Sequence, residues 1–150
     1  MNTRPVTILL VEDDAGHARL IEKNLRRSNI TNPIKIIGNG QEAVDYLFAE
    51  GKYVHSRHPS PLLVLLDLNL PGLDGYQVLK RMKENESTRR IPVVILTTTS
   101  DTREVARCYD LGCNVYITKP VDYERFSDAI RKIGLFLSVV TIPDGEEYRV

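Results

Sequence analysis

The stretch LLVLLDLNLPGLDGY, residues 62–76, decides how this chain folds. Five apolar residues, Leu62–Leu66, run directly into the carboxylate of Asp67, and the tripeptide LPG then turns the chain. A short apolar run bounded by turn residues predicts a strand covered on both faces. A carboxylate at the mouth of such a strand is costly to bury unless a cation meets it. Asp67 is therefore the first candidate for a functional residue.

Two other apolar runs also end in charged residues. Ile8–Val11 leads into Glu12 and Asp13, and the run that ends at Ile117 leads into Lys119. In an open sheet of parallel strands, the binding site lies outside the carboxyl ends of the strands. We therefore expect these groups to meet Asp67 at one edge of a sheet.

Apolar runs of four to six residues alternate with segments of helical period along the whole chain. The predicted strands are Thr7–Val11, Ile34–Ile37, Leu62–Leu66, Val93–Leu96 and Val115–Thr118. The predicted helices are Ala15–Ser28, Gln41–Glu50, Tyr76–Asn85, Thr102–Leu111 and Tyr123–Ser138. This alternation predicts an α/β fold, with one parallel sheet and helices on both faces.

Polar residues and glycines mark the ends of several predicted helices. Asp101 with Glu104 reads as a capping box, and Asp122 reads as the N-cap of the last helix. Gly112 reads as a helix stop. We interpret Asp74-Gly75 as a turn.

Size and composition describe one ordinary globular domain. The chain has 150 residues, 42% hydrophobic and 27% charged, with 20 basic and 20 acidic side chains. A net charge of zero argues against nucleic-acid binding. Neither a signal peptide nor a membrane span of about 18 apolar residues is expected, and the cytoplasm is the expected location. Cys108 and Cys113 read as small buried thiols, with a regulatory disulfide as the alternative.

The clustered acids predict phosphoryl chemistry. Carboxylates that repel one another favour a divalent cation, and oxygen ligands suit Mg²⁺ or Mn²⁺ rather than zinc. Lys119 is a point charge suited to a phosphoryl oxygen, and Thr97 offers a hydroxyl at the end of the fourth strand. Asp67 would then be the nucleophile that attacks phosphorus.

Each of these residues has a plainer explanation. Asp13 or Asp14 could cap the first helix, and Lys119 could be an ordinary loop lysine. Thr97 and Tyr116 could be present for their β-propensity alone. The combination, in this order and at strand ends, is much more specific than any single residue.

Four segments carry a resemblance to a known family. They are ILLVEDD (8–14), LLDLNLPGLDGY (65–76), IPVVILTTTS (91–100) and YITKP (116–120). The chain resembles the receiver domain of bacterial two-component response regulators from residue 5 to about 138, with 139–150 as an extension. The resemblance implies a single receiver domain of flavodoxin-like (βα)5 type with strand order 2-1-3-4-5. It also implies no enzyme activity beyond the domain's own phosphotransfer and dephosphorylation.

The resemblance assigns roles to individual residues. Asp67 would be the phosphoacceptor, and Lys119 would bind the phosphoryl group. Thr97 and Tyr116 would form the switch pair. The Mg²⁺ or Mn²⁺ site would consist of Glu12, Asp13, Asp67 and the backbone carbonyl of Asn69. Because Asn69 and Thr99 influence access of the hydrolysing water in the family, the lifetime of the phosphorylated form stays open.

A long connection at 51–61 and an apolar C-terminal segment at 135–142 are similar to the small regulators that partner bacterial phytochromes. This likeness implies a light-regulated histidine kinase as phosphodonor. It also implies a homodimer formed through the fourth helix, the fifth strand, the fifth helix and the extension. Residues 139–150 are too few for a DNA-binding domain, so we expect output through protein contacts.

Other functions are less favoured. A phosphatase of haloacid-dehalogenase type would need a second aspartate where Asn69 stands. In a nucleotide binder, the acidic loop Glu12–Gly16 would repel a phosphate not carried by metal. A degenerate receiver that is not phosphorylated is disfavoured because every expected group is present. Metal binding by His55 and His58 is an alternative to a solvated surface loop, which we favour.

Overall fold

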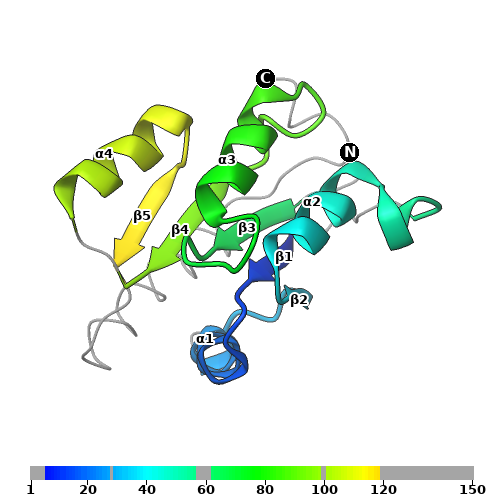
Figure 1. Cartoon of the computed structure of the whole chain (residues 1–150). Coiled ribbons are helices and arrows are strands. Elements are labelled where there is room, and N and C mark those ends of the chain that lie inside the picture. Colours follow the sequence, from blue (N-terminus) through cyan, green and yellow to red (C-terminus); the bar gives the residue numbers. More distant parts are fainter. Residues whose placement is uncertain (1–5, 28, 57–61, 99–100, 119–150) are drawn as a thin grey trace, which may run out of the picture.

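The sheet is the predicted one. The computed structural model describes residues 6–27, 29–56, 62–98 and 101–118. Its five parallel strands are ordered β2-β1-β3-β4-β5 (Figure 1). They are β1 (Thr7–Val11), β2 (Ile34–Ile37), β3 (Leu62–Leu66), β4 (Val93–Thr97) and β5 (Val115–Thr118). Every strand lies where the apolar pattern predicts it, and β4 is one residue longer.

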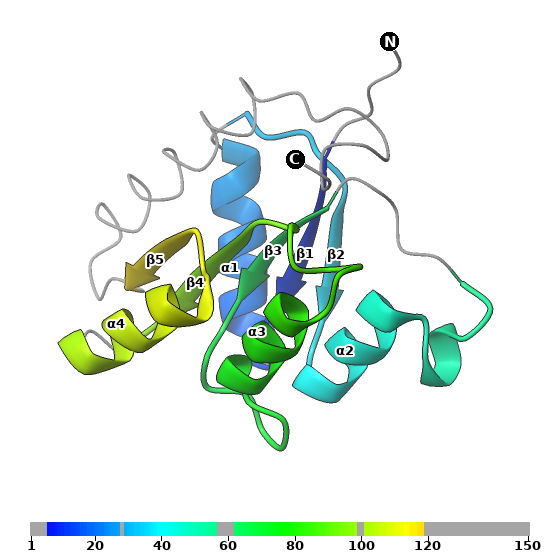
Figure 2. The ribbon, with the colours of Figure 1, turned by 90° about the horizontal axis from the view of Figure 1, so that it is seen from above.

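Helices cover both faces of the sheet. They are α1 (Ala15–Arg27), α2 (Gly40–Phe48), the 3-10 helix η1 (Gly51–Tyr53), α3 (Gly75–Glu84) and α4 (Thr102–Leu111). Figure 2 shows α1 on one face and α2, α3 and α4 side by side on the other. The predicted helix Tyr123–Ser138 and its cap Asp122 lie outside the described residues. Within the described residues, no helix has both the length and the apolar character to cross a bilayer.

The core has two layers because side chains alternate across each strand. Ile8 and Leu10 of β1 pack with α1, whereas Leu9 and Val11 pack with α2 and α3. All residues of β1, β3 and β4 are buried. These strands therefore read as unbroken apolar runs, as expected for parallel strands covered on both sides.

The helix ends correct two predictions. Asp74 is the N-cap of α3 in a complete capping box with Gln77, so its interpretation as only a turn was wrong. Asp101 does cap α4, but its side chain accepts from the N–H of Arg103 rather than from the third helical residue. Gly112 ends α4 in the left-handed conformation with φ 105°, as predicted.

The segment after α2 is partly folded. The second helix ends at Phe48, earlier than predicted, because Ala49 adopts a left-handed conformation with φ 56°. The Tyr53 hydroxyl of η1 then donates to Glu42 Oε2 at 2.7 Å, and its ring lies edge-on to Tyr46 with centroids 5.1 Å apart. The described residues of this connection are exposed except for the half-buried Tyr53, in agreement with the predicted surface loop, although its first turn forms η1. His55 is exposed, and His58 lies beyond the described part of this connection.

Candidate functional site

Two neighbouring strands deliver the acidic residues. In the β1–β3 pairing Val11 lies beside Leu66, so Glu12 and Asp67 leave the sheet next to each other. The backbone ladder continues one residue past both strands. The N–H of Glu12 donates to Ile37 O at 3.0 Å, and the N–H of Asp67 donates to Val11 O at 3.1 Å. The backbone of both acids is therefore held by the sheet itself.

Glu12, Asp13 and Asp67 come together as predicted. Each offers a carboxylate oxygen, and these oxygens lie within 4.8 Å of one another. Glu12 and Asp67 are only 3% and 6% exposed, whereas Asp13 is exposed. Buried carboxylates at such short separation repel one another strongly and favour a cation between them. An all-oxygen donor set with an exposed side fits a hard divalent ion that keeps some of its waters.

Backbone amides orient the two buried carboxylates. The N–H of Asn69 donates to Asp67 Oδ1 at 3.0 Å, and the N–H of Asp14 donates to Glu12 Oε2 at 3.1 Å. Asp14 itself accepts from the N–H of His17 at 3.0 Å, so it is the residue that caps α1. Asp13 is thereby left free of the capping role considered for it and contributes to the cluster.

Thr97 and Tyr116 lie on one face of the sheet. Ile95 pairs with Tyr116 across β4 and β5, and Thr97 follows Ile95 by two residues, so it shares that face. Thr97 is fully buried, and its Oγ1 accepts from Asn69 Nδ2 at 3.4 Å. The Tyr116 side chain is half-buried against the core on the α3 side. The switch residues suggested by the resemblance thus lie between Asp67 and the β5 edge.

Burial also affects the ionisation of this region. It raises the pKa of Tyr116 to about 12, so the phenol is neutral at physiological pH. The pKa of each cysteine thiol rises to about 11, chiefly for the same reason. Cys108 and Cys113 are free and buried, in agreement with the interpretation as small core thiols.

Gly75 is a site residue that sequence reasoning missed. A Cβ at this position would collide with the carbonyl oxygen of Asp67 and lie 2.6 Å from Leu68 Cα. The Gly75 N–H also donates to Leu68 O at 3.1 Å. The first turn of α3 is therefore pressed against the backbone that carries Asp67. The signal for this role was the Asp-Gly pair immediately before a helical pattern, which we took for a turn.

Lys119 lies outside the described residues. Its predicted contact with a phosphoryl group stays a prediction. The described chain places Thr118, the residue before it, opposite Thr97 in the β4–β5 pairing.

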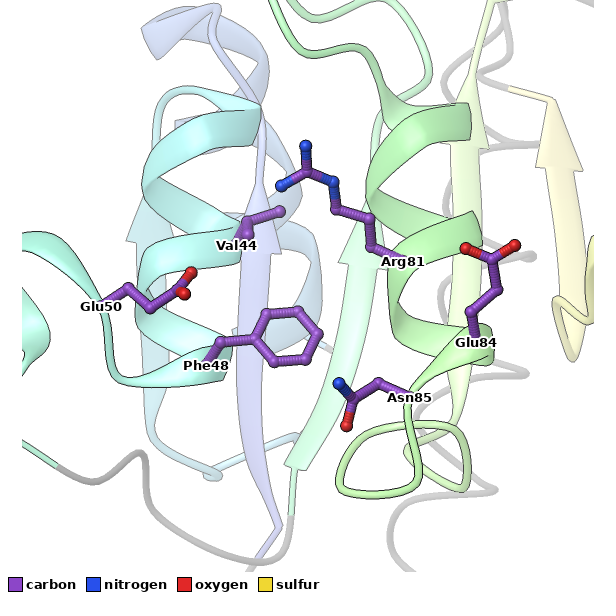
Figure 3. A pocket seen from close by; sticks show the side chains of 6 residues that line it. All are labelled: Val44, Phe48, Glu50, Arg81, Glu84 and Asn85. Atoms are coloured by element: carbon purple, nitrogen blue, oxygen red, sulfur yellow. The ribbon is translucent and has the colours of Figure 1, made fainter.

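A cavity of about 310 Å³ opens between the C-terminal parts of α2 and α3. In Figure 3, Phe48 and Arg81 reach into it from opposite helices, with Glu84 and Asn85 on the α3 side. The helices run against the strands, so this cavity lies toward the end of the sheet opposite the acidic cluster. It is separate from the candidate site.

Comparison with known proteins agrees with this geometry. The family model described as "Response regulator receiver domain" matches residues 8–131. Response regulator Rcp1 of Synechocystis is 40% identical over 140 residues, which are 93% of this chain and 94% of Rcp1. The crystal structure of the Mn(2+)-bound form of Rcp1 superposes with a TM-score of 0.83 at 38% identity, covering 93% of this chain and 99% of that one.

Two other crystal structures are also similar. A response regulator receiver domain from Rhodospirillum rubrum is 57% identical, with a TM-score of 0.82, covering 93% of this chain and 98% of that one. The phosphorylated cyanobacterial phytochrome response regulator RcpA is 35% identical, with a TM-score of 0.81, covering 92% and 99%. Fold, acidic cluster and relatives agree, and the chain belongs to the response regulator receiver domain family.

Proposed function

We propose that this chain is a phosphorylation-activated signalling switch in which Asp67 accepts a phosphoryl group from a histidine kinase. The observation that carries the proposal is the buried Asp67 carboxylate within 4.8 Å of the Glu12 and Asp13 oxygens. Receiver domains as a family are phosphorylated by histidine kinases. The haloacid-dehalogenase alternative lacks its second acid, because Asn69 stands at that position.

Glu12, Asp13, Asp67 and the backbone carbonyl of Asn69 would hold Mg²⁺ or Mn²⁺. The donor set supports this, since it contains only oxygens and carries excess negative charge. The Mn²⁺-bound state of Rcp1 supports it as well. When bound, the ion neutralises the acids and withdraws charge from the phosphoryl oxygens.

In the transfer step, an Asp67 carboxylate oxygen forms a bond to phosphorus while the phosphorus–nitrogen bond of the donor phosphohistidine breaks. The imidazole leaves with the electron pair, so Asp67 gives up no proton. The hydrogen bond from the Asn69 N–H to Asp67 Oδ1 holds the carboxylate in one orientation for this attack. Lys119 would neutralise a phosphoryl oxygen, as the sequence suggests.

Thr97 would report phosphorylation to the β5 side of the domain. Its hydroxyl already contacts Asn69 beside the acceptor. A phosphoryl group on Asp67 offers it a stronger, charged acceptor. Movement of Thr97 toward the phosphoryl group leaves space on its own face of the sheet, which Tyr116 would fill. The result is a population shift between two packings rather than a new fold.

A phytochrome-type histidine kinase is the phosphodonor we propose. RcpA is described as a cyanobacterial phytochrome response regulator, and a further structure at 38% identity as a bacteriophytochrome response regulator. Output would pass through protein contacts in the cytoplasm, without nucleic acid. The neutral net charge is consistent with that choice.

We also propose a homodimer through α4, β5, the predicted fifth helix and the extension. Among the described residues, Tyr109 of α4 and Val115 of β5 are 48% and 42% exposed on this side. Exposed apolar side chains of this size are suited to an interface. The apolar segment at 135–142 would add to the same surface.

Incubation with acetyl phosphate and Mg²⁺ tests the acceptor. We expect a base-labile adduct of about 80 Da, one phosphoryl group, on Asp67. Asp67→Asn should abolish the adduct, and Asp110→Asn, which changes an exposed carboxylate on α4, should not. Chelation of the metal should also abolish it. An adduct that persists in Asp67→Asn would disprove the site.

The other two proposals need separate experiments. A phosphotransfer profile against purified histidine kinases should show the fastest transfer from a phytochrome-type kinase; preference for an unrelated kinase would reject that partner. Sedimentation of the full chain and of a chain truncated after Gly134 tests the dimer. Identical monomeric behaviour of both chains would reject it.

A further inference from the structure

Helix α4 is attached to the body of the protein by few buried side chains. Of its ten residues, all of them described, Cys108 is the one that is buried. Helix α3 has the same length and buries Val78, Leu79 and Met82 together with Gly75. Because few α4 side chains are buried, each contact between α4 and its neighbour α3 contributes a large share of the free energy that holds α4 in place.

One such contact is a stack of a cation on an aromatic ring. The guanidinium carbon of Arg107 lies 4.1 Å from the ring centroid of Tyr76. Tyr76 belongs to the first turn of α3, and α3 and α4 lie side by side in both views of the molecule (Figures 1 and 2). A planar guanidinium at this distance is well placed for a cation–π interaction.

Tyr76 is also directly connected to the acceptor. The preceding residue, Gly75, lies against the backbone of Asp67 and Leu68 with no room for a Cβ. A shift of the acceptor backbone must therefore move the first turn of α3. Tyr76 would carry that shift to Arg107, and Arg107 to α4.

The Tyr76 hydroxyl is buried and has no hydrogen-bond partner. A buried donor without an acceptor costs free energy of the same order as a cation–π contact provides. The two effects oppose each other in this packing of α3 against α4. The free energy that holds α4 against α3 is therefore small, as is required of an element that switches between two conformations.

We propose that the Tyr76–Arg107 stack is a latch that couples phosphorylation of Asp67 to the attachment of α4. In the unphosphorylated protein the latch holds α4 against α3, and a shift at Asp67 releases it. Arg107 and Tyr76 are positioning residues and take no part in the transfer step. The inference rests on the proposed phosphorylation of Asp67.

Amide hydrogen exchange of α4 measures the latch, with and without beryllofluoride and Mg²⁺ as a phosphoryl mimic. In the native chain, the mimic should accelerate exchange of the α4 amides several-fold. Arg107→Ala should accelerate it to a similar extent without the mimic and leave little further response. Arg103→Ala is the matched control, because it removes an exposed arginine of α4 whose guanidinium pairs with Asp101 of the same helix end.

Tyr76→Phe should act in the opposite direction. It keeps the ring under Arg107 and removes the unpartnered hydroxyl, so α4 exchange should become slower and the response to the mimic smaller. A stack with no coupling to Asp67 would also give these opposite changes, so the response to the mimic, which Arg107→Ala should lose, is the readout that tests the coupling. The proposal is overturned if Arg107→Ala keeps the full native response to the mimic, or if both variants exchange at the native rate without it.

The acetyl phosphate adduct separates this proposal from the proposed function. If the native chain forms no adduct, phosphorylation of Asp67 fails and the coupling fails with it. If every variant forms the adduct at the native rate but α4 exchange never changes, the latch alone is wrong.

Discussion

Strands β4 and β5 are neighbours in one sheet, yet they differ sharply in packing. All five residues of β4 are buried, whereas the four residues of β5 are half-buried or exposed. The adjacent helices differ in the same way, since α3 buries four residues and α4 buries one. The side of the domain that carries Asp67, from β1 to β4, is therefore tightly packed, whereas α4 and β5 have few buried side chains.

The two regions are suited to different functions. Phosphoryl transfer depends on fixed geometry, and Asp67 is held by a sheet backbone that is covered on both faces. A conformational response needs an element that opens at low cost, and such elements have few buried apolar contacts. At about 1.5–3 kcal/mol for each large side chain buried, the attachment of α3 exceeds that of α4 by several kcal/mol.

The largest loss of stability is expected on substitution of Gly75, which lies in the tightly packed region. Gly75→Ala should reduce the free energy of unfolding by about 3 kcal/mol, because the new Cβ meets backbone atoms that no rotamer change can move. It should also slow phosphorylation. Urea denaturation and the acetyl phosphate adduct measure the two effects. Gly38→Ala is the control, since a Cβ there meets nothing within 4 Å, and a loss as large as that of Gly75→Ala would remove the steric explanation.

A matched pair of valines tests the contrast between the strands directly. Val93→Ala in β4 should cost about 2 kcal/mol of unfolding free energy, because Val93 is fully buried. Val115→Ala in β5 should cost less than about 0.5 kcal/mol, because Val115 is 42% exposed. Urea midpoints at an unchanged slope give both values. Equal losses would mean that β5 is packed as well as β4.

The helix caps should show the same order, with a smaller difference between the two sides. Asp74 is part of a reciprocal capping box on α3, whereas the Asp101 side chain caps α4 by accepting a hydrogen bond from the N–H of Arg103. Asp74→Ala should cost about 1.5 kcal/mol and Asp101→Ala about 0.5–1 kcal/mol. Thermal unfolding of both variants beside the native chain measures the difference. A reversed order would contradict the packing contrast at the helix ends.

A further effect on stability, expected at Tyr53, depends on pH. The hydrogen bond from Tyr53 lowers the pKa of Glu42 from its ordinary 4.5, with Lys52 contributing less. A carboxyl pKa lowered by folding adds stability above the unfolded pKa, and that stability is lost as the pH falls through the folded pKa. Tyr53→Phe should therefore cost about 1 kcal/mol at pH 7 and progressively less below pH 4.5.

Tyr109→Phe on α4 is the control for this pH dependence. The Tyr109 hydroxyl accepts from the N–H of Tyr116 at 3.1 Å, so its partner does not titrate. Its cost should be independent of pH in the acid range. A parallel loss of both effects below pH 4.5 would argue against the Glu42 explanation.

Local pattern was sufficient for the strands but not for every helix end. The unbroken apolar run Leu62–Leu66 predicts a strand that is buried on both faces. The observed bounds of β3 match this run. The end of α2 at Phe48 was not, because the left-handed conformation of Ala49 carries no glycine signal. The role of Asp74 was missed because a capping box and a turn begin with the same residue types.

The amino-acid order alone places Glu12, Asp13 and Asp67 at the ends of apolar runs, and parallel strands must end at one edge of their sheet. The acidic cluster was therefore predictable, since it follows from periodicity and topology. The close approach of Gly75 to Asp67 and the stack of Arg107 on Tyr76 were not. These contacts join residues whose separation is decided by how helices pack against one another, and helix packing depends on the fit of whole side-chain surfaces that no local pattern encodes.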